Sequence, residues 1–271
     1  MGFVYRVVLI NIPGFGEIGK GFYNSGYQIY AILLTLSSVG IPTVISKLVA
    51  ERVSKGDHKG AHRIFRLCLM LFAGIGLVLS ISLFFWAEQI ATLVLNIPDV
   101  AHVLRVLAPA IVFVAISSVL RGYFAGLGSM KAASISQTLE QFFKCVLTIT
   151  LVYSFLGDEP VLMAAAGNLA TTLAILLSFS YLVIFYRRRR KGILFSEQEQ
   201  NLPEENEKSW TLIKTILAIS VPMTLGSLVS IINNTIDTIT ISHIVQNFYD
   251  YTIIVAENYE LEAMRLVRNA S

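Results

Sequence analysis

The 271-residue chain has the composition of a membrane protein rather than a soluble one. Hydrophobic residues make up 55% of it and charged residues only 14%, whereas an average soluble protein is about 25% charged, so the chain has too little polar surface to cover soluble domains. The net charge of +3 at pH 7 also excludes the broad basic surface that nucleic-acid binding requires.

The apolar residues form runs that are long enough to cross a bilayer as helices. About 20 apolar residues cover a hydrocarbon core about 30 Å thick. Runs without any Asp, Glu, Lys or Arg are residues 22–46, 67–87, 161–186 and 215–236. They do not alternate with a period of two, which favours helices over the strands of a barrel. The predicted spans, in chain order, are residues 22–50, 64–86, 103–127, 132–156, 161–186 and 210–245.

Residues 1–13 are apolar but too short to cross alone, and we expect them to be the end of a first helix whose beginning is missing. The spans together predict an all-α, polytopic membrane protein.

The connections between these spans alternate in charge. In chain order they are residues 47–66 (basic), residues 87–104 (acidic), Arg121 with Lys131, Asp158 with Glu159, and the basic run 187–191. Because Lys and Arg are enriched in cytoplasmic connections, we predict that the basic connections face the cytoplasm. The protein is therefore expected to be a multi-pass protein of the cytoplasmic membrane.

Two segments toward the C-terminus differ from the spans. Residues 187–209 combine the basic run with five glutamates, and we predict a charged cytoplasmic linker between the bundle of residues 1–186 and the span 210–245. The basic run most simply anchors the topology, although it could also bind anionic lipid head groups or nucleic acid. Residues 246–271 form an atypical polar tail that is not predicted to span the membrane.

Charged and amide side chains occur within the span 132–156. Glu140 and Lys144 lie four residues apart, with Gln137 close on the same side. A charge at mid-bilayer costs about 3 kcal/mol on insertion scales, so such residues usually face an interior or a cavity. Two interpretations stay open: a self-neutralising pair that helps the helix to insert, or a polar wall along a substrate path.

A second group of polar side chains lies toward the end of the predicted span 210–245. Asp237 follows Asn233 and Asn234 after an uncharged run of 22 residues, with no cation within one helical turn. It is either a coupling site for H⁺ or Na⁺ or a hydrated carboxylate near the outer interface. Arg6, in the incomplete first helix, either supplies positive charge to the same cavity or extends to the interface.

The chain shows no motif for soluble chemistry. His58 and His62 have a spacing found in zinc sites, but no third ligand accompanies them. Signatures of hydrolases and of metalloproteases are also absent. We therefore predict a non-enzymatic protein with no catalytic residue, no bound metal and no cofactor.

Several motifs resemble those of one transporter family. They are residues 121–126 (RGYFAG), Met130, residues 136–141 (SQTLEQ), residues 40–47 (GIPTVISK), and residues 222–228 (PMTLGSL) with Asp237. These segments resemble signatures of the polysaccharide-transport branch of the multidrug/oligosaccharidyl-lipid/polysaccharide exporter superfamily. The likeness is greatest to its stage V sporulation protein B group, which is related to the lipid II flippases. It covers roughly residues 2–243, and it departs at Ala132, where proline is common, and at Lys144, where arginine is common.

The resemblance implies a MATE-like fold of some fourteen helices in two lobes. Residues 1–186 would then form most of the N-terminal lobe, and residues 210–245 the first helix of the second lobe. We therefore expect the chain to be part of a longer transporter.

The resemblance also implies a function, namely a flippase or exporter that moves a lipid-linked oligosaccharide or cell-wall precursor across the cytoplasmic membrane by alternating access. The partners would be that lipid-linked substrate, membrane lipids and a coupling cation. The residues expected to bind the substrate are Arg6, Lys47, Gln137, Glu140 and Lys144. The residues expected to take part in ion coupling are Asp237, Asn233 and Asn234. The alternatives are a drug/cation antiporter of the same fold and a membrane-embedded glycan transferase or polymerase.

Overall fold

The computed structural model describes residues 12, 15–38, 40–95, 97–157, 159–198 and 210–233, with the side chains of all but 16–18 and 190–198. The regular structure within these residues is entirely α-helical. The labelled helices are α2 (Gly16–Ser38), α3 (Ile41–Ser54), α4 (His58–Leu93), α5 (Val100–Gly126), α6 (Met130–Ser154) and α7 (Pro160–Gln198). A further helix covers Trp210–Asn233. The chain divides into two compact units, Met1–Leu228 and Val229–Ser271, and α2 to α7 all belong to the first.

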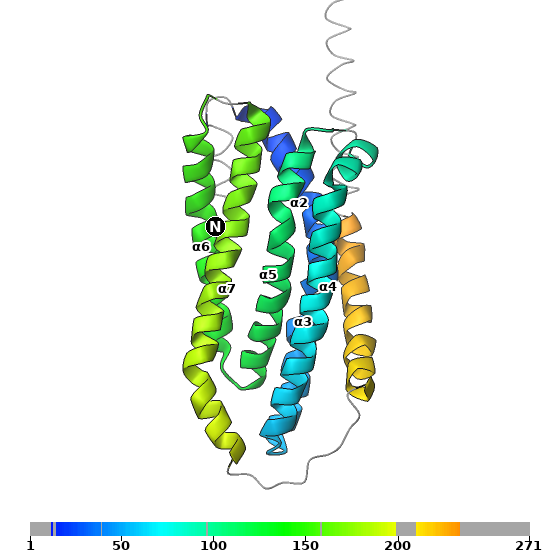
Figure 1. The fold of residues 1–271 in the computed structure, drawn as a ribbon, viewed down its shortest axis with the longest axis vertical. Coiled ribbons are helices and arrows are strands. Elements are labelled where there is room, and N and C mark those ends of the chain that lie inside the picture. Colours follow the sequence, from blue (N-terminus) through cyan, green and yellow to red (C-terminus); the bar gives the residue numbers. More distant parts are fainter. Residues whose placement is uncertain are drawn as a thin grey trace, which may run out of the picture. The chain divides into compact units, whose positions relative to one another are not determined.

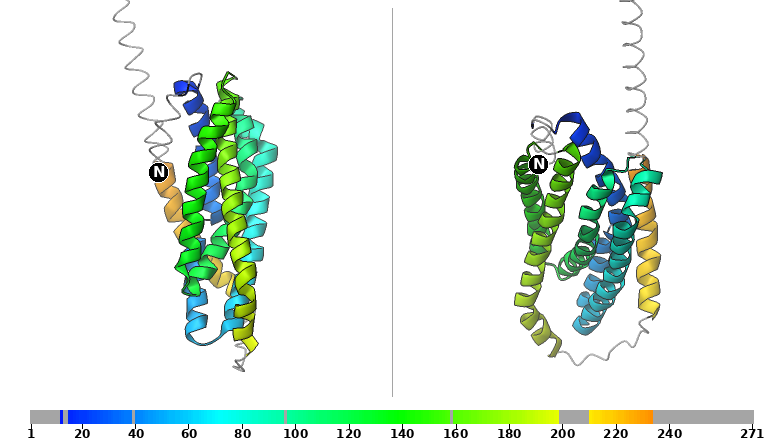
Figure 2. Two further views of the ribbon diagram at one scale, coloured as in Figure 1. Left: turned by 90° about the vertical axis from the view of Figure 1, so that its left-hand side faces the viewer. Right: turned by 45° about the horizontal axis from the view of Figure 1, so that its top comes forward.

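Helices α2 to α7 lie lengthwise beside one another as a bundle (Figure 1), and two further views show the same alignment (Figure 2). Helix α5 forms its centre because it packs against α2, α3, α4 and α7, with a smaller contact to α6. Helix α6 packs chiefly along α7. The bundle confirms the predicted all-α fold of a multi-pass membrane protein.

Five described segments are long and apolar enough to cross a membrane by length and composition. They are Gly19–Ser54, His58–Leu93, Val100–Gly126, Pro160–Arg189 and Trp210–Asn233. Helix α6 is not among them. It still links the end of α5 to the start of α7 at the opposite end of the bundle (Figure 1), so it traverses the same thickness as its neighbours. Its charges need partners inside the protein rather than lipid.

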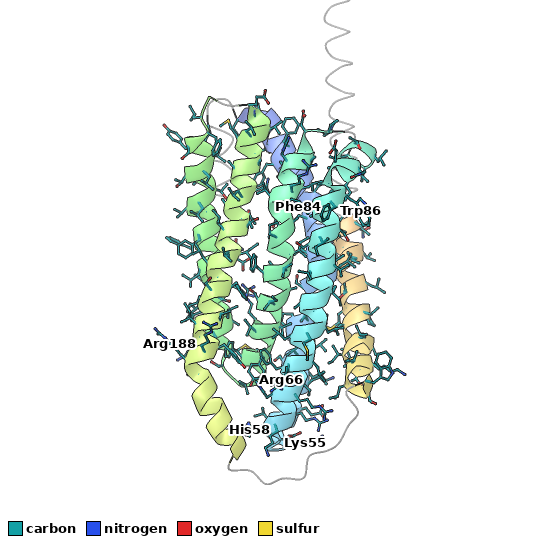
Figure 3. The ribbon with its side chains drawn as sticks, viewed as in Figure 1. Lys55, His58, Arg66, Phe84, Trp86 and Arg188 are labelled. Carbon is teal, nitrogen blue, oxygen red and sulfur yellow. The ribbon has the colours of Figure 1, made fainter. Side chains whose placement is uncertain are left out.

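The connections are sorted between the two ends of the bundle. The α3–α4 and α5–α6 connections lie at one end, whereas the α4–α5 and α6–α7 connections lie at the other (Figure 1). Lys55, His58, Arg66 and Arg188 are found toward the first end, and Trp86 lies farther along α4 toward the second (Figure 3). Cations of the 47–66 connection and of the basic run 187–191 thus lie toward the same end of the bundle, as the predicted alternation requires (Figure 3).

The helices differ from the predicted spans in three respects. The span predicted near residues 22–50 is divided into α2 and α3, because Gly40 adopts a left-handed conformation with φ 82° and Pro42 follows in the first turn of α3. Helix α4 begins at His58, where Asp57 caps it by accepting a hydrogen bond from the Gly60 amide at 2.7 Å. Helix α7 continues to Gln198, into the stretch predicted as a linker.

Two glycines allow α3 and α5 to approach closely. A Cβ atom at Gly122 would lie 2.8 Å from the Pro42 Cα atom, and one at Gly126 would lie 2.7 Å from the Val49 Cβ atom. Paired small residues four apart are the usual means of close helix packing in membranes, where lipid removes the hydrophobic driving force between helices. The glycines of the RGYFAG motif are therefore explained by packing.

Candidate functional site

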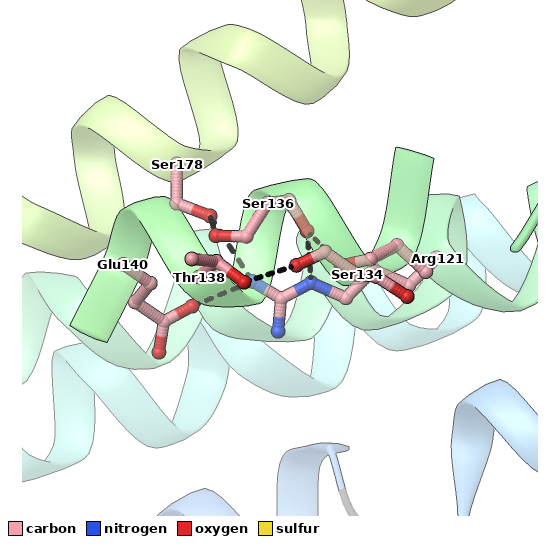
Figure 4. A network of polar contacts seen from close by, with 7 residues as sticks. Arg121, Ser134, Ser136, Thr138, Glu140 and Ser178 are labelled. Carbon is pink, nitrogen blue, oxygen red and sulfur yellow. Dashed lines mark hydrogen bonds and ion pairs between the residues drawn. The ribbon is translucent and has the colours of Figure 1, made fainter. Parts of the chain in front are cut away.

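A polar network joins α5, α6 and α7 inside the bundle (Figure 4). Arg121 on α5 donates from Nη2 to the Glu140 carboxylate at 2.5 Å and to the Ser178 hydroxyl at 3.1 Å, and from Nε to the Ser136 hydroxyl at 2.9 Å. The hydroxyls are themselves oriented: Ser178 donates to the Ser136 carbonyl at 2.8 Å, and Ser136 donates to the Ala133 carbonyl at 2.8 Å. The guanidinium is therefore held by residues from two other helices.

Burial makes this ion pair different from one at a surface. The side chains of Arg121 and Glu140 are only 11% and 20% exposed, and Ser136 and Ser178 are fully buried. The attraction between the two charges offsets the free energy needed to remove them from water. Either charge buried alone in this setting would be strongly unfavourable.

The network corrects two sequence interpretations. Arg121 does not lie in a connection as an orientation signal; it lies within α5, because that helix continues to Gly126. The ion-pair partner of Glu140 is Arg121, nineteen residues away, and not Lys144 one turn along α6. The self-neutralising pair considered for Glu140 and Lys144 does not form.

Lys144 instead meets an aromatic ring from α2. Its ammonium lies 4.3 Å from the centroid of the Tyr27 ring, and the residue is 8% exposed. The ring face attracts a cation through its quadrupole, and the neighbouring rings of Tyr23 and Tyr30 lie 6.4 Å and 5.6 Å from that of Tyr27. Within the described part of the chain, Lys144 has no carboxylate partner.

The three charged groups leave this region positive. Arg121 and Lys144 contribute two positive charges and Glu140 one negative charge, which gives a net charge of +1 when all three are ionised. Glu140 and Lys144 are separated by one turn of α6, about 6 Å along its axis. An anionic group on a ligand would balance the excess charge.

The other expected substrate residues are placed differently. Gln137 is exposed on α6, and Lys47 is exposed near the middle of α3. Arg6 lies outside the described residues. The structure therefore brings Glu140 and Lys144 into one region with Arg121, and it leaves Lys47 exposed on α3.

The expected coupling residues are largely outside the described part of the chain. Asn233 is the last described residue of the helix Trp210–Asn233, where it is exposed. Asn234 and Asp237 lie beyond it, outside the described residues.

Two residues of this region were not expected from the sequence. Arg121 could have been recognised as a buried ion-pair partner. A cation one turn before the end of an apolar run needs an anion, and the motif SQTLEQ supplies the Glu140 carboxylate. Tyr27 gave no such signal, because nothing local distinguishes it from the other tyrosines of the same helix.

A family model described as "Polysaccharide biosynthesis protein" matches residues 1–248. Stage V sporulation protein B of Bacillus subtilis (strain 168) is 34% identical over 188 residues, which are 67% of this chain and 36% of that protein. Lipid II flippase MurJ of the same organism is 25% identical over 250 residues, which are 89% of this chain and 46% of that protein. The chain thus spans less than half the length of these relatives.

Solved structures of similar fold include MATE transporters. A crystal structure of MATE in complex with MaD3S has a TM-score of 0.68 at 18% identity, covering 83% of this chain and 50% of that one. An outward-facing multidrug resistance MATE family transporter of the MOP superfamily has a TM-score of 0.64 at 19% identity, covering 84% and 49%. These likenesses establish the MATE-like fold.

Proposed function

The chain belongs to the polysaccharide biosynthesis protein family, and we propose that it acts in a flippase for a lipid-linked oligosaccharide or cell-wall precursor. The flippase would operate in the cytoplasmic membrane by alternating access between two helical lobes. Residues 1–186 would contribute most of one lobe and residues 210–245 the first helix of the other, joined by the charged stretch around residues 187–209.

The observation that supports this proposal is the uncompensated charge of Lys144. A buried cation in a membrane is costly and is usually retained for a function. Here the only carboxylate one turn away is already paired with Arg121 at 2.5 Å, and the ammonium rests on the Tyr27 ring. An anionic diphosphate head group would gain a charge-assisted contact from this ammonium.

The remaining residues have proposed roles in the same cycle. Glu140 holds Arg121 in place, and the two side chains together form the polar wall beside Lys144. Gln137 lines the path by which the substrate reaches that wall. Lys47 and Arg6 are proposed to contact the head group at other stages of transport. Asp237, with Asn233 and Asn234, is proposed to bind the coupling cation, H⁺ or Na⁺.

A cationic drug is a less suitable substrate for this region. Lys144 would repel it, and the carboxylate that the described residues place beside it, Glu140, is neutralised by Arg121. The MATE-like fold by itself does not favour a drug, because one fold hosts many functions.

The test is reconstitution of a two-lobed transporter that contains this chain into liposomes with a fluorescent polyprenyl-diphosphate-linked saccharide in both leaflets. An impermeant quencher added outside reaches only the outer leaflet unless head groups cross. We expect quenching to extend to the inner-leaflet pool with the unaltered two-lobed transporter. The Lys144→Arg variant should retain this result, because it keeps the positive charge.

Lys144→Gln should slow this crossing, because a hydrogen bond to a charged group contributes about 1.5–3 kcal/mol, or roughly 10- to 150-fold in affinity. Lys131→Gln, which removes an exposed cation from the start of α6, is the matched control and should have no effect. Crossing that is unchanged in Lys144→Gln would remove the central support for the proposal.

A further inference from the structure

One face of α6 carries exposed side chains in the first turns of the helix and buried side chains farther along. Ser134, Gln137 and Gln141 are exposed, whereas Lys144 and Thr148 are buried. Residues spaced by three, four and seven lie on one side of a helix, so these five form a single stripe. The stripe begins at the α5–α6 end of the bundle, where the predicted cytoplasmic connections lie, and it continues past Lys144, which contacts the Tyr27 ring, to Thr148.

The exposed part of this stripe is unsuited to lipid. Gln137 and Gln141 have no hydrogen-bond partner among the described residues, and an unpaired amide in hydrocarbon costs several kcal/mol. The lipid-facing side of α6 is a different one, marked by the exposed apolar residues Ile135, Phe142 and Val146. The two carboxamides therefore face water or a polar ligand.

The Gln137 and Gln141 carboxamides lie at distances from the Lys144 ammonium that a sugar attached to a phosphate could bridge. At 1.5 Å per residue, Gln141 is about 4.5 Å and Gln137 about 10.5 Å from Lys144 along the axis. A carboxamide offers both a donor and an acceptor, which matches a sugar hydroxyl or acetamido group, while the ammonium matches phosphate. A ligand with phosphate at one end and sugar at the other would satisfy the whole stripe.

We propose that Gln137 and Gln141 form a sugar-binding subsite that opens toward the cytoplasm, with the adjoining diphosphate at Lys144. This inference rests on the proposed function and makes it specific, since it fixes the direction in which the head group enters. The amides would then determine which sugar is accepted, whereas Lys144 recognises only the charge.

Cysteine labelling tests whether the stripe is open to water. The full chain carries two cysteines, Cys68 and Cys145, which are replaced by alanine before Gln137→Cys or Phe142→Cys is introduced. In inside-out vesicles, an impermeant maleimide should modify Gln137→Cys rapidly and Phe142→Cys slowly, although both positions are exposed. Equal rates at the two positions would overturn the water-lined stripe, whatever the protein transports.

Protection from labelling then tests the ligand. The probes are uridine diphosphate N-acetylglucosamine, a soluble sugar diphosphate, and uridine diphosphate, which lacks the sugar. Native Cys145, which directly follows Lys144 and is partly exposed, reports on the diphosphate in a Cys68→Ala chain. We expect both probes to slow the labelling of Cys145, and only the sugar diphosphate to slow that of Gln137→Cys.

The two proposals fail in different ways. If neither probe protects Cys145, the anion site of the proposed function is wrong. If both probes protect Cys145 equally and the sugar diphosphate does not protect Gln137→Cys, the sugar subsite alone is wrong. Gln137→Leu should raise the concentration of sugar diphosphate needed to protect Cys145 by up to about tenfold, and should leave that of uridine diphosphate unchanged.

Discussion

We predict that Glu140→Gln destabilises the bundle far more than a surface substitution of the same kind. The change keeps the shape of the side chain and removes its charge, so the Arg121 guanidinium stays buried with only neutral acceptors, namely the new amide oxygen and the Ser136 and Ser178 hydroxyls. The effect therefore measures an uncompensated cation at membrane depth rather than a cavity.

The magnitude follows from the burial of the pair. Breaking a buried ion pair by removing one partner costs about 3–5 kcal/mol. The side chains of Arg121 and Glu140 are 11% and 20% exposed, so we expect a loss of about 3 kcal/mol, the lower end of that range. Removing both charges, in Arg121→Gln with Glu140→Gln, should restore part of the loss, because no unpaired charge then remains.

Unfolding by sodium dodecyl sulfate in mixed micelles, followed by circular dichroism, measures the free energy of unfolding. The matched control is Glu88→Gln, which breaks the ion pair to Arg105 at 3.1 Å, where the two side chains are 70% and 39% exposed. Exposed pairs contribute at most about 1 kcal/mol, so this variant should remain close to the unaltered chain.

Two results would refute this reasoning. One is a Glu140→Gln chain no less stable than Glu88→Gln. The other is a double variant whose loss equals the sum of the two single losses, since contacting charges should show a coupling energy of about 0.5–3 kcal/mol.

Three further predictions use the same unfolding measurement. Gly122→Ala should cost about 1–3 kcal/mol through overpacking, because its Cβ atom would lie 2.8 Å from the Pro42 Cα atom, whereas Gly74→Ala, with nothing within 4 Å, should be neutral or stabilising. Gly40→Ala should cost about 1–2 kcal/mol, because its φ of 82° disfavours a Cβ atom; a smaller loss would show that the break between helices relaxes. Lys144→Met should stabilise the bundle while slowing lipid transport by the two-lobed transporter in liposomes at least as much as Lys144→Gln, and a variant that transports at the unaltered rate would contradict the proposed role of the ammonium.

Much of the fold could be predicted because it depends on local sequence. Charge-free runs of 20 or more residues predicted α4, α7, the helix Trp210–Asn233 and the segment that forms α2 and α3. The alternating connections predicted that the α3–α4 and α5–α6 connections share one end, as the structure shows (Figure 1). The errors occurred at helix ends. Arg121 was assigned to a connection because hydropathy does not mark where α5 ends, and α7 continues into charged sequence that hydropathy alone excludes from a span.

The amino-acid sequence by itself determined that this protein crosses the membrane as helices, and it singled out Glu140 and Lys144 as polar groups at membrane depth. Only the tertiary structure decided their partners: Arg121 for the carboxylate, and Tyr27 for the ammonium. The physical reason is that the bilayer acts on each segment separately, so composition and length suffice to select a span. Which buried charge is neutralised and which is left in excess depends instead on how distant helices pack, and no local pattern contains that information.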